Sequence, residues 1–109
     1  MQDIFCERLK KSREIRGLTQ NELGTKAQLP PSSIAHFETG TRKPSFDNLR
    51  RLAEALSVTT DYLLGRVDKP GLPASADVLF RDFDKLSDND RDITAKFIQM
   101  LTERNSKNG

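Results

Sequence analysis

Apolar residues in the first 65 positions recur at intervals of three and four, which is the spacing of one face of a helix. Five short segments have this pattern, and each is bounded by a helix cap or a glycine: residues 3–17, 19–27, 31–39, 46–57 and 59–65. Nothing before Gly65 alternates as a strand does, so the pattern predicts an all-α domain over residues 1–65. The expected core consists of Leu9, Leu18, Leu23, Ala27, Ile34, Leu49, Leu52, Leu56, Val58 and Leu63.

The chain continues with a short non-helical segment and more helix. Residues 66–76 contain prolines and a glycine, which predict a linker or an ordered strap. Two helical pieces follow within residues 77–105, and the N-cap of the second is Ser87, with three aspartates in the first turn. These pieces are too apolar for a solvated tail, so they pack either on their own domain or on a second chain. We favour a homodimer interface, which would consist of Leu79, Phe83, Ile93, Phe97, Met100 and Leu101.

Two adjacent prolines, Pro30 and Pro31, precede the third helical segment. Proline at the first helical position loses nothing, because that N–H has no partner within the helix. Pro31 fits this position, Pro30 then becomes the N-cap, and Leu29 is forced into an extended conformation. A sharp turn between two short helices is the helix-turn-helix, whose second helix presents its first turn to the DNA major groove.

The distribution of charge supports two different roles for the two parts. The net charge is only +2, which by itself is a weak argument for nucleic-acid binding. Residues 1–66, however, hold 11 Lys/Arg and 8 Asp/Glu, a balance of +3, whereas residues 67–109 hold 7 and 8, a balance of −1. The first part is therefore mildly basic and the second mildly acidic.

Composition argues against several other classes of protein. One cysteine and one histidine make a disulfide, a metal site or His-rich catalysis improbable, and we expect no metal and no cofactor. There is no Ser/His/Asp constellation and no glycine-rich phosphate loop, so we do not expect an enzyme. No apolar run approaches the roughly 20 residues that span a bilayer, and the N-terminus lacks the apolar core of a secretory signal. A reducing cytoplasm is the expected setting.

The ordered motifs over residues 4–65 resemble a known family. They are "LTQ-E-L" at 18–23, "SIAHFETG" at 33–40, "KPS" at 43–45 and "LRRLAEALSV" at 49–58. In this order and at this spacing they are similar to the phage-repressor-like, or Xre-type, helix-turn-helix regulators. The resemblance implies a five-helix, lambda-repressor-like DNA-binding domain followed by a C-terminal helical dimerisation segment. The family usually has Ala where Gly24 stands, Gly where Gln28 stands, and Ser or Thr where Pro30 stands.

The resemblance also implies roles for individual residues. Base edges would be contacted from the outward positions of the third helix, namely Pro31, Ser32, Ser33 and His36. Phosphates would be contacted by Thr19, Gln20, Thr39, Thr41, Arg42, Lys43 and Ser45. A partly buried ion pair, Arg13 with Glu38, would join the first and third helices. The alternatives are that Thr19 is only a cap, that His36 is ordinary surface, and that Arg42 and Lys43 are solvated charges.

We therefore expect a sequence-specific DNA-binding regulator, most simply a dimeric repressor of a palindromic operator. The alternative is a protein-interaction module or antitoxin whose C-terminal helices bind a protein, such as a toxin or an anti-repressor.

Overall fold

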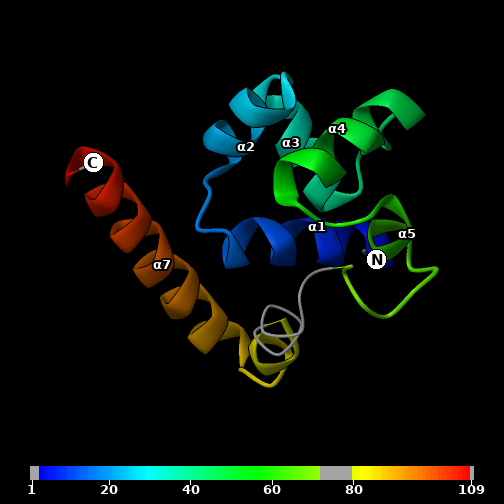
Figure 1. Cartoon of the computed structure of the whole chain (residues 1–109). Helices are drawn as coiled ribbons and strands as arrows, with labels where there is room; N and C mark the ends of the chain where they lie inside the picture. The colour runs from blue at the N-terminus through cyan, green and yellow to red at the C-terminus, as the bar shows by residue number, and fades with distance from the viewer. Residues whose placement is uncertain (1–2, 72–79, 109) are drawn as a thin grey trace.

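The computed structural model describes residues 3–71 and 80–108, and all regular structure in these ranges is helical (Figure 1). The helices α1 to α5 occupy Ile4–Ile15, Gln20–Ala27, Pro31–Thr39, Phe46–Leu56 and Thr60–Leu64. Residues 80–84 are also helical, and the long helix α7 spans Asp88–Asn108. The all-α fold class is confirmed. Leu79, one of the predicted interface residues, lies outside the described residues.

Short polar side chains begin most of the helices, because the first backbone N–H groups of a helix lack partners within it. Thr19 and Glu22 form the predicted capping box, with the Thr19 hydroxyl accepting from the Glu22 N–H at 3.0 Å. Ser45 accepts from Asn48 N–H at 3.2 Å, and Thr59 caps α5 in the same way. These contacts are local in sequence, which is why the helix starts could be predicted.

One hydrophobic core joins helices α1 to α5 with residues 80–83. Every residue of the predicted core is buried except Leu18, which is half-buried and packs against the rest. The core also contains Phe80 and Phe83 from the C-terminal part, both 3% exposed. Phe83 is thus covered by its own chain, and its assignment to a dimer interface is corrected, since a buried ring is not available to a second chain.

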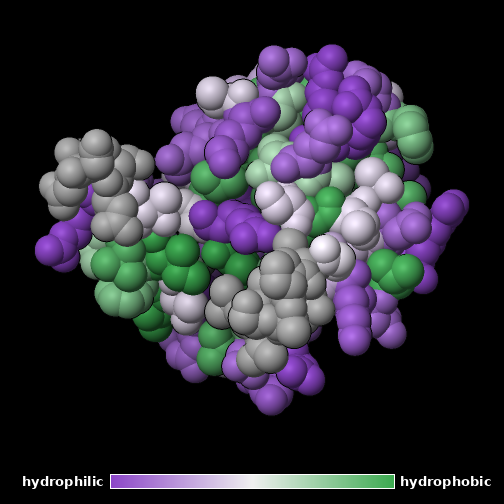
Figure 2. Space-filling view, in the orientation of Figure 1, coloured by the Kyte–Doolittle hydropathy of each residue, from purple (hydrophilic) through white to green (hydrophobic). Residues whose placement is uncertain are grey.

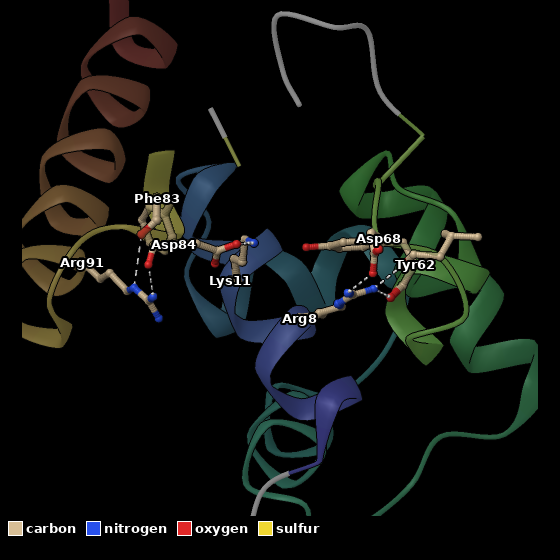
Figure 3. Close-up of polar contacts among 8 residues, drawn as sticks. Arg8, Lys11, Tyr62, Asp68, Phe83, Asp84 and Arg91 are labelled. Carbon is tan, nitrogen blue, oxygen red and sulfur yellow. Dashed lines mark hydrogen bonds and ion pairs between the residues drawn. The ribbon is translucent and has the colours of Figure 1, made fainter. Parts of the chain in front are cut away.

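Residues 66–71 are the described part of the segment predicted as a linker or an ordered strap, and residues 72–76 lie outside the described residues. Pro70 is buried and its carbonyl accepts from Thr59 N–H at 3.1 Å. Arg8 of α1 lies across the Tyr62 ring, 4.3 Å from its centroid, and donates from Nη1 to the Tyr62 carbonyl at 2.7 Å and the Val67 carbonyl at 2.6 Å (Figure 3). One arginine of α1 therefore holds the end of α5 and the strap together.

Polar contacts join the C-terminal part to α1 and join residues 80–84 to α7 (Figure 3). Lys11 donates to Asp84 at 2.6 Å, and Arg91 at the start of α7 donates to the carbonyls of Phe83 and Asp84 at 3.2 and 2.8 Å. The Tyr62 ring packs edge-on against Phe80, with centroids 5.9 Å apart. Together these contacts set where α7 begins relative to the first domain.

Helix α7 packs on the molecule with one face only. A Cβ added at Gly17, just after α1, would lie 2.7 Å from both Ile98 Cγ2 and Thr102 Oγ1, so α7 approaches the backbone there closely. A second set of α7 residues faces away: Ile93, Phe97 and Met100 are 58%, 55% and 56% exposed, and Leu101 is 38% exposed. Hydrophobic residues accordingly gather on the surface over α7 in Figure 2. The helix thus has one docked face and one exposed apolar face.

Candidate DNA-binding surface

A proline corner separates α2 from α3. Gln28 ends α2 in the left-handed conformation, with φ 59°, and Leu29 N–H donates to the Gly24 carbonyl at 2.8 Å. Pro30 then takes the N-cap position in extended conformation without a side-chain cap, and Pro31 is the first residue of α3. The two prolines therefore occupy the positions predicted for them, and they fix where α3 begins.

Gly24 explains how so tight a corner fits. A Cβ at this position would lie 2.6 Å from the Leu29 carbonyl oxygen and 3.4 Å from the Pro31 nitrogen. Backbone atoms at such distances have no room to move aside, so the alanine typical of similar proteins does not fit this corner. Gly24, Pro30 and Pro31 together therefore allow the tight turn between α2 and α3.

Helix α3 presents the predicted base-contacting residues outward. Ile34, Phe37 and Glu38 are its buried residues, and they hold α3 on the domain. The outer positions are exposed at Pro31, Ser32 and His36 and half-buried at Ser33. The first turn of α3 is consequently uncovered by its own chain, as entry into a major groove requires.

The loop after α3 carries two exposed cations that stay unbonded. Among the described residues, neither the Arg42 guanidinium nor the Lys43 ammonium forms a hydrogen bond or an ion pair. Arg50 and Arg51 differ, because Asp47 binds both, at 2.8 and 3.1 Å. The two loop cations are therefore available to an anion, whereas the two helix cations are already neutralised.

The rest of the loop is ordered by short contacts. The Thr39 and Thr41 hydroxyls lie 2.9 Å apart, and the backbone N–H groups of Thr41 and Arg42 both donate to the His36 carbonyl, at 3.0 and 3.3 Å. Thr39, Thr41 and Ser45 are all exposed. The structure thus brings the predicted phosphate contacts of this loop together next to the end of α3.

A buried polar network supports α2 and α3 from behind. Arg13 donates from Nε and Nη2 to the two Glu38 carboxylate oxygens at 2.6 and 3.1 Å, and from Nη1 to the Leu18 carbonyl at 2.9 Å. The Gln20 amide donates to Glu38 Oε1 at 3.2 Å. Sequence reasoning expected the Arg13–Glu38 pair but missed Gln20 as a third member. The contact of Gln20 with Glu38 places the N-terminus of α2 beside the end of α3.

A long-range charge effect also reaches the loop. The pKa of the Asp3 carboxyl is lowered, chiefly by hydrogen bonding to Cys6 and to a lesser degree by the Lys43 ammonium. The N-terminus of α1 therefore lies near the loop after α3.

Comparison with known proteins agrees with this geometry. A helix-turn-helix family model matches residues 9–63. The regulator YobD of Bacillus subtilis is 36% identical over 67 residues, which is 62% of this chain and 60% of YobD. The regulator ImmR of the same organism is 37% identical over 60 residues, 55% of this chain and 47% of ImmR. The chain thus spans only about half to three-fifths of these two relatives.

Two other proteins are similar over nearly the whole chain. The regulator YqaE of Bacillus subtilis is 28% identical over 102 residues, covering 92% of this chain and 88% of YqaE. A solved complex of the SinR and SinI proteins superposes with a TM-score of 0.55 at 24% identity, over 94% of this chain and 98% of that one, a likeness in fold alone. With the family model matching half of its residues, the chain belongs to the Xre-type helix-turn-helix family of transcriptional regulators.

Proposed function

We propose that this protein binds a palindromic double-stranded DNA site as a homodimer and represses transcription there. The observation that carries the proposal is the pair of unbonded cations, Arg42 and Lys43, directly after a recognition helix whose first turn is exposed. When side-chain cations that lack protein partners bind phosphates, they release the counterions condensed on the DNA, and this release supplies much of the affinity.

Base contacts would come from the outer side of α3. Ser32 and Ser33 can donate or accept toward several bases, and His36 can donate to a purine N7 or O6. None of these is an arginine or a glutamine, so the strong bidentate pairings with guanine and adenine are missing. We expect modest direct recognition, with DNA shape and bridging water providing part of the specificity.

Dimerisation would place two recognition helices roughly 34 Å apart, one helical turn of DNA. The exposed apolar face of α7 supports this, because Ile93, Phe97 and Met100 stay uncovered while Ile98 on another side of the helix is docked. In a two-fold symmetric dimer, this face would pack against the same face of a second copy of the chain. Linking two weak binding domains raises the affinity for paired half-sites through effective concentration.

A DNA-binding measurement tests the proposal. Fragments that bind are first selected from random DNA, and a gel-shift titration then compares the selected fragment with a scrambled one at moderate salt. We expect clear preference for the selected fragment, and equal affinity for both would reject sequence-specific binding.

Sedimentation tests the dimer separately. Phe97→Asp should give monomers and weaken binding to the selected fragment, because a carboxylate would be buried at the centre of the apolar face. Gln99→Asp is a matched control, since it adds the same charge to the same helix outside the exposed apolar residues. A Phe97→Asp protein that sediments like the wild type would show that the interface lies elsewhere.

A second protein is the alternative occupant of the α7 face. It is favoured by the likeness in fold to a solved complex of two proteins, SinR and SinI. Purification of an untagged partner at a fixed ratio with the wild-type chain, lost with Phe97→Asp, would support this function over homodimerisation.

A further inference from the structure

Phe46 is the most exposed large hydrophobic residue among those described, at 77%. A single exposed apolar residue is ordinary on a protein surface, so exposure alone means little. Its place in the fold is more informative. It is the first residue of α4 and follows Ser45 and Lys43, two of the residues to which we assign phosphate contacts.

The apolar face of α4 extends beyond the core at this end. Phe46 precedes Leu49, Ala53 and Leu56 at intervals of three, four and three, so all four share one side of the helix. The last three are 6%, 3% and 0% exposed, whereas Phe46 is left uncovered. Phe46 therefore extends the apolar face of α4 beyond the part of that face that is buried in the core.

The direction of the ring follows from helix geometry. The Cα–Cβ bonds of an α-helix tilt toward its N-terminus, so a side chain at the first position leans back over the preceding residues. For Phe46 these residues are the loop from Thr41 to Ser45, which carries the unbonded cations. The exposed ring thus lies next to the loop to which we assign phosphate contacts.

We propose that Phe46 packs against the deoxyribose of the DNA backbone next to the phosphates bound by Lys43 and Ser45. Sugar C–H groups are the apolar surface that lies between successive phosphates, and burying an aromatic ring against them adds affinity by removing apolar area from water. This inference rests on the proposed function, and it adds a contact that is apolar and therefore independent of counterion release.

The salt dependence of binding separates this contact from an electrostatic one. On the fragment selected with the wild-type protein, Phe46→Ala should weaken binding about tenfold per subunit, equivalent to about 1.4 kcal/mol. The slope of log K against log salt should stay unchanged, because no phosphate charge is released or regained. Lys43→Ala, measured in parallel, should make the slope shallower by about 0.9 per lost contact.

Two controls keep the result interpretable. Leu64→Ala removes an apolar side chain that is 42% exposed on α5, which is not one of the elements to which we assign DNA contacts, and should leave the affinity unchanged. The thermal midpoint of Phe46→Ala should equal that of the wild type, because the ring makes little contact within the folded chain. Unchanged affinity of Phe46→Ala, or a loss accompanied by a shallower slope, would overturn the inference. If the wild type itself fails to prefer the selected fragment, the proposed function fails instead.

Discussion

The ion pair between Arg13 and Glu38 yields the sharpest prediction about stability. Its side chains are 13% and 5% exposed, and the guanidinium makes two hydrogen bonds to the carboxylate and one to the Leu18 carbonyl. Arg13→Met removes the cation while keeping most of the side-chain volume. The Glu38 carboxylate would then stay buried with its cationic partner lost.

The cost can be estimated from this geometry. Breaking a buried pair from one side typically costs about 3–5 kcal/mol, because one charge loses its compensation. We expect the lower end, about 3 kcal/mol, since the Gln20 amide still donates to Glu38 Oε1. For a domain of this size that corresponds to a fall of about 12 °C or more in the thermal midpoint.

Urea unfolding followed by circular dichroism at pH 7 measures the loss. The double variant Arg13→Met/Glu38→Gln should recover part of it, because the amide removes the buried charge. Arg50→Met is a control that breaks exposed pairs with Asp47 and Glu54, and it should leave the midpoint nearly unchanged. If Arg13→Met costs no more than Arg50→Met, the reasoning about burial is wrong.

Three further predictions concern DNA binding, packing and pH. Lys43→Ala should weaken binding to all DNA alike, whereas His36→Ala should change the preference among sequences in a competition gel shift; a uniform loss for His36→Ala would contradict its contact with bases. Gly24→Ala should lower the free energy of unfolding in urea by about 1 kcal/mol, because the overlap of the new Cβ with the Leu29 carbonyl outweighs the gain of about 1 kcal/mol in helix propensity. A higher free energy of unfolding than that of the wild type would refute this. Burial raises the pKa of the Glu14 carboxyl, so ionising it costs stability as pH rises above the usual range of a glutamate. Glu14→Gln should therefore raise the thermal midpoint at pH 7, with the difference vanishing in acid, where the wild-type carboxyl is protonated; a lower midpoint at pH 7 would reverse the argument.

Much of the fold was predictable because its signals are local. Helix caps bond to backbone N–H groups within three residues in the chain, as Thr19, Glu22 and Ser45 do, so the local sequence is enough to predict where a helix begins. Pro31 acts through its own fixed φ angle and its missing N–H. The three-and-four spacing of leucines likewise depends only on the period of a helix.

Contacts between distant residues were beyond such reasoning. The sequence pattern grouped Phe83 and Phe97 in one apolar set. Only the packing of residues 80–84 on α1 and α5 decided that Phe83 is buried while Phe97 is exposed. Gln20 was expected at a phosphate, and the structure adds its bond to Glu38, which lies 18 residues away.

The sequence by itself determined where the helices begin and end and that a proline corner exposes the first turn of α3. These properties follow from the conformations and hydrogen-bonding needs of single residues and their near neighbours. The tertiary structure alone decided that Gly24 accommodates the Leu29 carbonyl, that Gly17 receives α7, and which apolar residues stay uncovered. Those outcomes depend on which surfaces meet in space, and a periodic pattern specifies a face without specifying what packs against it.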